Sequence, residues 1–146
     1  MTTPPAERGG SPVLASLTGI LVLADAGLAA LGVTVWNAHR HGHLTGAEAA
    51  TFMLLGASAA IGAVVYLFTL IALARGTHGR GLARLASRLA WLRTAGVVIA
   101  LIAFVILIGV SAIAGALETF GIVLAVLDAL AAVYVTGVAV RRTRGG

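Results

Sequence analysis

The sequence predicts an all-α integral membrane protein: a four-transmembrane-helix bundle made of two antiparallel helical hairpins, with a basic amphipathic cytoplasmic connector between them. Three observations predict this fold. Hydrophobic residues make up 60% of the 146-residue chain and the mean hydropathy is +1.04, whereas soluble domains are about half apolar. Only 10% of the residues are charged, against about a quarter in soluble proteins. Finally, the apolar sequence on each side of a central arginine-rich segment is long enough to cross a bilayer twice.

The N-terminal part of the chain combines a polar leader with the first apolar run. Residues 1–12 are polar and rich in Pro and Gly, which predicts a disordered cytoplasmic N-terminus. Residues 13–36 form a run with Asp25 as its only charge. About 20 helical residues cross a bilayer core, so we expect a span here. The apolar pattern continues well past a signal-peptide-sized core, which favours a retained anchor over a cleaved leader.

A second span is predicted over residues 47–74, after the short polar connection 37–46. Its small residues repeat at four-residue spacing, for example Gly56–Ala60 and Ser58–Gly62. Such pairs let helix backbones approach closely in lipid. An alanine-rich helix also produces such pairs by chance, and the sequence leaves both interpretations open.

The segment Arg75–Arg93 separates the two predicted hairpins and carries five of the ten arginines. Its leucines recur at helical spacing on one face, and most of its arginines recur on another face. This pattern predicts an amphipathic helix lying in the headgroup region. A cytoplasmic extension of the third span fits the pattern equally well. In either geometry we expect its arginines to bind anionic lipid headgroups, and the candidates are Arg80, Arg84, Arg88 and Arg93.

The rest of the chain predicts a third span over 94–114, a fourth over 119–140 and a basic cytoplasmic tail over 141–146. Four spans place both termini and the central segment on one side of the membrane. Nine of the ten arginines then lie on that side, and Arg40 alone lies on the other. The positive-inside rule therefore predicts a multi-pass protein of a bacterial-type inner membrane with N- and C-termini in the cytoplasm.

Two acidic residues fall near the middle of predicted spans, Asp25 in the first and Asp128 in the fourth. A carboxylate at the bilayer centre costs on the order of 2.5–3.5 kcal/mol. The predicted spans offer no intramembrane Arg, Lys or His to offset this cost, so we expect the acids to be at least partly protonated. They either exchange protons or cations or fix helix packing through a hydroxyl, with Thr18, Ser58, Thr69 and Tyr134 as the candidate partners.

Three histidines alternate in the predicted outer loop: His39, His41 and His43. In an extended segment, alternate side chains share one face, and imidazole is a common ligand of Zn, Cu and Ni. This pattern gives a weak metal-site hypothesis, because loop histidines are more often simply solvated.

The sequence favours a non-enzymatic function without a cofactor. It contains no cysteine, it has no phosphate-binding glycine loop or Ser/His/Asp nucleophile pattern, and its arginines suit a membrane surface better than nucleic acid. We expect an accessory or interaction subunit of the membrane, as a homo-oligomer or within a larger complex. The alternative is a proton- or cation-coupled transporter using Asp25 and Asp128. The plan of four spans with an acid in the first span resembles that of small multidrug-resistance transporters. The acid here is Asp rather than Glu, however, and the aromatic lining of those transporters is missing. We therefore do not assign the chain to that family.

Overall fold

The computed structural model describes residues 12–43, 46–108 and 116–144, and all of its long elements are helices. The four α-helices are α1 (Pro12–Arg40), α2 (Gly46–Ala74), α3 (Arg80–Ile108) and α4 (Ala116–Arg144). Each contains 29 residues, or about 43 Å at 1.5 Å per residue. All four are long and apolar enough to cross a membrane. The prediction of an all-helical chain with four membrane-length helices is therefore confirmed.

Residues at each end of helix α1 explain where the helix begins and ends. Pro12 is its first residue, where the fixed φ and the missing N–H of proline suit a first turn. Beyond Arg40, Gly42 adopts a φ of +76°, a conformation that L side chains rarely adopt. The amide of Gly42 donates to His39 O at 3.0 Å and that of His43 to Ala38 O at 3.0 Å. These two bonds form a Schellman motif, which satisfies the last carbonyls of the helix.

The arginine-rich segment does not form a separate helix lying in the membrane plane. A short 3-10 turn, η1 (Gly76–Gly79), follows α2, and α3 then runs without a break from Arg80 to Ile108. The structure therefore has the alternative geometry, in which the basic segment is the first part of the third long helix. Its start is tied to the end of α4, because Arg80 Nε donates to Thr143 O at 3.1 Å. The C-terminal arginines likewise belong to the last turn of α4 rather than to a separate tail.

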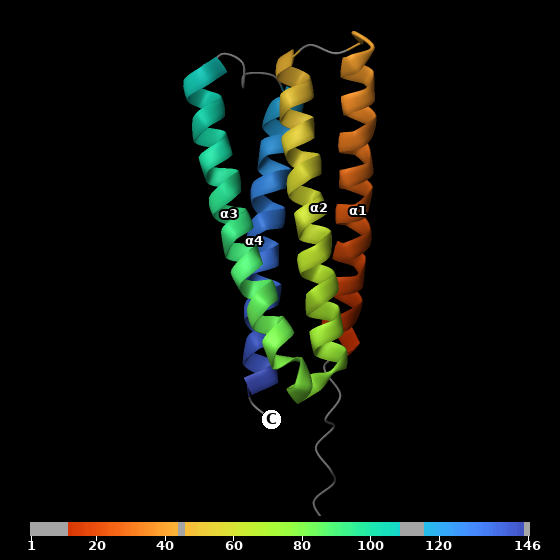
Figure 1. Ribbon diagram of the computed structural model, residues 1–146, viewed down its shortest axis with the longest axis vertical. Coiled ribbons are helices and arrows are strands. Elements are labelled where there is room, and N and C mark those ends of the chain that lie inside the picture. The colour runs from red at the N-terminus through yellow and green to blue at the C-terminus, as the bar shows by residue number, and fades with distance from the viewer. Residues whose placement is uncertain (1–11, 44–45, 109–115, 145–146) are drawn as a thin grey trace, which may run out of the picture.

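Helix α2 occupies the centre of the arrangement, packing against α1, α3 and α4 (Figure 1). Helices α1 and α2 approach closely at a point where two glycines face each other. A Cβ built on Gly56 would lie 2.6 Å from Gly32 Cα, and one on Gly32 would lie 2.8 Å from Gly56 Cα. Real Cβ atoms do not occur at such distances, so this crossing requires glycine on both helices. The small-residue repeat of the second span therefore has at least one packing role.

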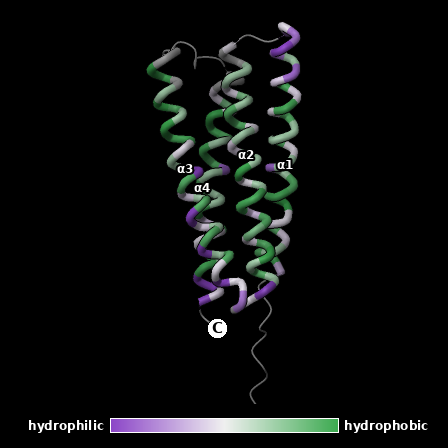
Figure 2. The backbone as a smooth tube through the Cα atoms, in the orientation of Figure 1, coloured by the Kyte–Doolittle hydropathy of each residue, from purple (hydrophilic) through white to green (hydrophobic). Residues whose placement is uncertain are grey.

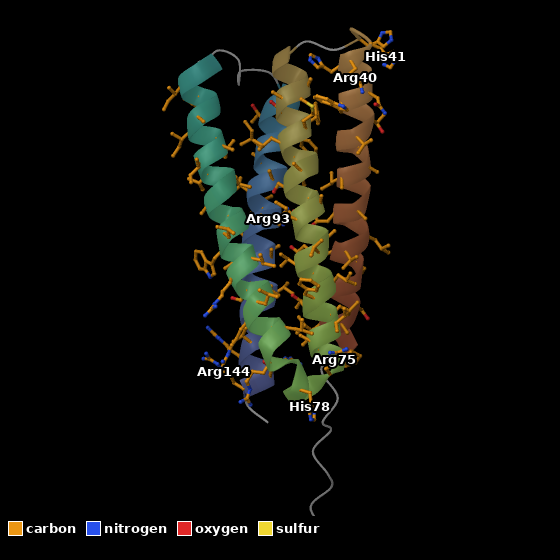
Figure 3. All side chains as sticks on the ribbon, viewed as in Figure 1. Arg40, His41, Arg75, His78, Arg93 and Arg144 are labelled. Carbon is orange, nitrogen blue, oxygen red and sulfur yellow. The ribbon has the colours of Figure 1, made fainter. Side chains whose placement is uncertain are left out.

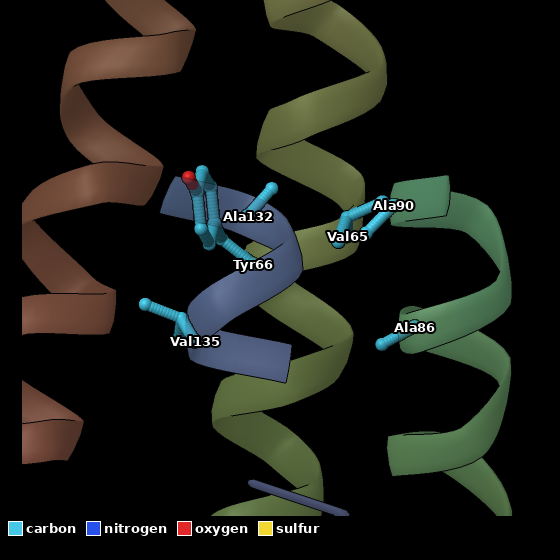
Figure 4. Close-up of a cluster of buried hydrophobic side chains, with 6 residues drawn as sticks. All are labelled: Val65, Tyr66, Ala86, Ala90, Ala132 and Val135. Carbon is cyan, nitrogen blue, oxygen red and sulfur yellow. The ribbon is translucent and has the colours of Figure 1, made fainter. Parts of the chain in front are cut away.

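Small side chains also line the contacts of α2 with α3 and α4 (Figure 4). Tyr66 of α2 is fully buried and lies on the side of Ala132 and Val135 of α4. Its neighbour Val65 lies on the side of α3, by Ala86 and Ala90. Alanine at these contacts keeps the helix backbones close.

Large apolar side chains are exposed on all four helices, and most of the backbone in Figure 2 has the hydrophobic colour. Leu23 of α1 and Ile106 of α3 are each 74% exposed, and many others are exposed by half or more. A soluble monomer rarely shows such a continuous apolar surface. In Figure 2 the hydrophilic colour is concentrated near the helix ends and reappears at one level near mid-height. The arrangement is consistent with a small multi-pass membrane protein.

Candidate functional site: a buried ionic cluster

The hydrophilic level at mid-height is built around Arg93 of α3 (Figure 3). The side chain of Arg93 is only 1% exposed, and the residue lies halfway along its helix. Arg93 falls on the buried side of α3, in helical register with Ala86, Ala90 and Val97. The expectation that Arg93 binds lipid headgroups is therefore wrong, because neighbouring helices enclose its guanidinium. Arg80, Arg84 and Arg88 lie on other sides of α3, partly or well exposed.

The strongest partner of Arg93 is Asp128 of α4. Arg93 Nη2 contacts Asp128 Oδ2 in a direct ion pair, and the Asp128 side chain is 9% exposed. The hydroxyl of Tyr66 donates to the other carboxylate oxygen, Oδ1, at 3.2 Å and lies equally close to the Asp128 backbone carbonyl. Charge-assisted hydrogen bonds of this kind are about twice as strong as neutral ones. Asp128 is thus held by one residue of α3 and one of α2.

Asp25 of α1 faces the same guanidinium from the other direction. Its Oδ2 lies 3.7 Å from Arg93 Nη1, and the whole residue is 1% exposed. This distance allows strong electrostatic attraction but is too long for a hydrogen bond. Asp25 Oδ2 and Arg93 Nη1 are indeed buried without a hydrogen-bond partner among the described residues. The contact of Asp25 with the arginine is therefore looser than that of Asp128.

Helix α2 contributes both a hydrogen bond and the space for this cluster. Arg93 Nε donates to Ser58 Oγ at 3.0 Å. One turn further along α2, Gly62 lies against the charged groups. A Cβ at this position would meet Asp25 Oδ2 and Arg93 Nη1, and would lie 2.7 Å from Arg93 Cζ. We call Asp25, Ser58, Tyr66, Arg93 and Asp128 the central polar cluster; it joins all four helices.

The structure changes the interpretation of the two acids. The expectation that no intramembrane arginine offsets their cost is wrong, because Arg93 lies beside both carboxylates. Of the hydroxyls considered from the sequence, Ser58 enters the cluster but binds the arginine. Thr18 and Thr69 instead donate to carbonyls of their own helices, and Tyr134 is 72% exposed.

Sequence reasoning missed Arg93 and Tyr66 as members of this site. A signal for Arg93 exists in the helical spacing. Arg80, Arg84 and Arg88 follow one another every four residues, and the next position of that series is Leu92, not Arg93. Arg93 instead continues the small-residue series that includes Ala86 and Ala90. An arginine on an alanine face is a sign of an inward-pointing charge.

The chemistry available to the cluster follows from its charges. Two carboxylates and one guanidinium carry a net charge of −1 when all are ionised, and a single bound proton neutralises the set. Charges taken out of water are tolerated when they are paired and hydrogen-bonded. The cluster can therefore cross-link the helices, and it has the composition of a site that holds one exchangeable proton.

The structure does not group the three alternating histidines, His39, His41 and His43, into a metal site. His39 lies in the last turn of α1, so the segment is not extended as the metal hypothesis requires. The ring of His41 uses Nδ1 in a 2.7 Å hydrogen bond with Asn37 O. Within the described part of the chain, no three His, Asp or Glu side chains are grouped closely enough to hold a metal ion.

Comparison with known proteins gives no further assignment. No protein-family model, no curated protein and no solved structure matches this chain.

Proposed function

We propose that this protein is a non-enzymatic accessory or interaction subunit of a bacterial-type inner membrane, folded as a bundle of two helical hairpins. The observation that carries the proposal is the central polar cluster. One guanidinium connects carboxylates from α1 and α4 and a hydroxyl from α2, and its surroundings are so tight that Gly62 cannot carry a methyl group without displacing it. Such a closed cluster suits a fixed helix arrangement better than a substrate passage.

The exposed side of α1 supports an interaction role. Helix α1 packs mainly against α2. Within the most apolar 18-residue stretch of α1, only 11% is buried. A partner helix, from a second copy or from a larger complex, has a whole apolar face on which to pack. In lipid such association depends on close packing rather than on the hydrophobic effect, so a homo-oligomer or a hetero-complex follows naturally from this surface.

The proposed orientation places both termini in the cytoplasm, because eight of the ten arginines then lie on the cytoplasmic side. Arg40 alone lies on the other side, and Arg93 lies buried between the helices. The chain has no native cysteine, so single-cysteine variants report one position each. In intact cells, a membrane-impermeant maleimide should label His43→Cys and should label Gly146→Cys only after the cells are opened. Labelling of Gly146→Cys in intact cells would overturn this orientation.

The alternative function is a proton- or cation-coupled transporter. One observation favours it: the cluster has one more carboxylate than guanidinium, and Asp25 Oδ2 has no hydrogen-bond partner among the described residues. Asp25 could therefore bind and release one proton during a cycle that moves α1 relative to α2.

Proton flux in proteoliposomes distinguishes the two functions. We compare the wild type with Asp25→Asn and Asp128→Asn, and use Glu118→Gln at the start of α4 as the matched carboxylate control. The accessory role predicts no flux above empty liposomes for any protein, and reduced thermal stability for the two Asn variants only. Flux in the wild type that both Asn substitutions abolish, without loss of stability, would replace the accessory role by the transporter.

A further inference from the structure

A cleft between α3 and α4 lies near the helix ends that carry most of the arginines. It has a volume of about 440 Å³ and is lined by Arg84, Ser87 and Arg88 of α3 and by Val140 and Arg144 of α4. Three guanidinium groups from two helices therefore border one space. Figure 3 shows Arg144 at this end of α4, close to the beginning of α3.

The charges around this cleft are not balanced within the described part of the chain. Arg84, Arg88 and Arg144 are all exposed, and the ion pairs formed by the described acids, Asp25 and Asp128, are with Arg93 instead. Three like charges around one space repel each other unless an anion joins them. Arginine binds phosphate oxygens through paired N–H groups, so a phosphate group is the anion that the lining fits best.

The surface of α3 beyond the cleft is apolar and follows the same helical face. Trp91 and Leu92 are 62% and 70% exposed about one turn beyond Arg88. They lie within two residues of Arg93, so they are level with the central polar cluster, where acyl chains rather than headgroups surround a membrane protein. The exposed apolar stripe continues along α3 through Ile99, Ile102 and Ile106 towards the opposite membrane surface. A basic cleft followed by exposed apolar residues has the same order of chemistry as a phospholipid: phosphate, then acyl chain.

The depth of the cleft agrees with this order. Along α3, Arg84 and Arg88 precede Arg93 by nine and five residues, or about 13.5 and 7.5 Å. Arg144 follows Asp128 by 16 residues on α4, or about 24 Å. With Arg93 and Asp128 at the bilayer centre, half of the hydrocarbon core extends about 15 Å from them. Arg84 and Arg88 then lie inside the hydrocarbon edge and Arg144 lies outside it. The long arginine side chains extend towards the phosphate level.

We propose that the cleft between α3 and α4 is a discrete binding site for one anionic glycerophospholipid. Arg84, Arg88 and Arg144 bind its phosphate, and an acyl chain lies along α3 past Trp91 and Leu92. This inference rests on the proposed membrane location. It goes further than a general attraction between arginines and anionic lipids, because three arginines from two helices border one cleft and bind one phosphate there.

Tryptophan quenching tests the site directly. The chain has two tryptophans, so a Trp36→Phe background leaves Trp91 as a probe beside the cleft. The full-length protein is reconstituted in phosphatidylcholine bilayers that contain increasing amounts of phosphatidylglycerol with brominated acyl chains, which quench nearby indoles. Brominated phosphatidylcholine in the same proportions gives the reference. The converse Trp91→Phe background reports from Trp36, at the far end of α1.

Two double variants with the same change in charge distinguish a discrete lipid-binding site from a general electrostatic attraction to anionic lipids. Arg88→Gln/Arg144→Gln removes two cleft arginines, and Arg141→Gln/Arg142→Gln removes two arginines of the same membrane side that do not line the cleft. We expect Trp91 to show a phosphatidylglycerol preference that falls about tenfold in the first variant and less than about twofold in the second. Trp36 should show no preference.

Several results would overturn the proposal. Equal losses in the two double variants would mean diffuse attraction, since each surface arginine contributes similarly to such a field. Full displacement of the lipid by inorganic phosphate at constant ionic strength would mean a site for free phosphate. A monodisperse wild-type protein obtained without detergent would refute the membrane location itself, which is a different outcome from a failed lipid test.

Discussion

Replacing Arg93 by methionine is the sharpest test of the central polar cluster. Met retains most of the side-chain volume and removes the charge, leaving Asp25 and Asp128 buried without their shared partner. At the 3.7 Å separation of Asp25 Oδ2 and Arg93 Nη1, the gross attraction between unit charges is about 4.5 kcal/mol at an effective dielectric constant of about 20. The cost of taking the two charges out of water offsets most of this attraction. Removing one partner of a buried ion pair costs about 3–5 kcal/mol in measured cases. We expect Arg93→Met to lower the free energy of unfolding by that amount.

The assay is equilibrium unfolding in mixed neutral detergent and sodium dodecyl sulfate, followed by circular dichroism. The matched control is Arg142→Met, the same substitution at an exposed position that does not line the cleft between α3 and α4, which should change the free energy of unfolding by less than about 0.5 kcal/mol. Dodecyl sulfate bound in that cleft then affects the wild type, the variant and the control alike.

Double-mutant cycles with Asp25→Asn and Asp128→Asn then test the geometry. Asp128 is in direct contact with Arg93, whereas Asp25 is not hydrogen-bonded to it. We expect a coupling energy of about 2–3 kcal/mol between Arg93 and Asp128 and about 1 kcal/mol between Arg93 and Asp25. Wild-type stability of Arg93→Met, or a stronger coupling to Asp25 than to Asp128, would refute the reasoning.

Three further substitutions test the packing around the cluster by the same unfolding assay. Gly62→Ala should cost about 1–3 kcal/mol because its methyl group would displace the charged groups; Gly96→Ala, with open space around it, should be neutral or slightly stabilising, and equal effects would contradict the crowding. Gly56→Ala should cost more than Gly62→Ala, since its Cβ would lie 2.6 Å from the Cα of the facing α1 glycine and a backbone atom cannot move aside as a side-chain end can, and an unchanged midpoint would argue against the close crossing. Tyr66→Phe should cost about 1–2 kcal/mol by removing the hydroxyl bonded to Asp128, whereas Tyr134→Phe, at an exposed site, should leave stability unchanged. A loss that is as large for Tyr134 as for Tyr66 would show that the hydroxyl bond is not responsible.

The sequence alone determined the class of protein and the number of membrane-length helices, because hydropathy and segment length are local properties. It also placed Asp25 and Asp128 near the middle of their helices, since position along a helix follows from counting residues. It left open whether the basic segment lies in the membrane plane or extends the third helix, because the same amphipathic spacing suits both geometries.

Only the tertiary structure decided which charges meet. The spacing of Arg93 among alanines indicates an inward face of α3, but it does not say which helices that face contacts. Asp25, Arg93 and Asp128 come from three different helices, and they share one location because Gly62 leaves room for them and the crossing of α1 with α2 brings Asp25 within reach. A pattern within one helix fixes the direction of a side chain relative to its own axis, whereas its partners depend on the packing of all four helices.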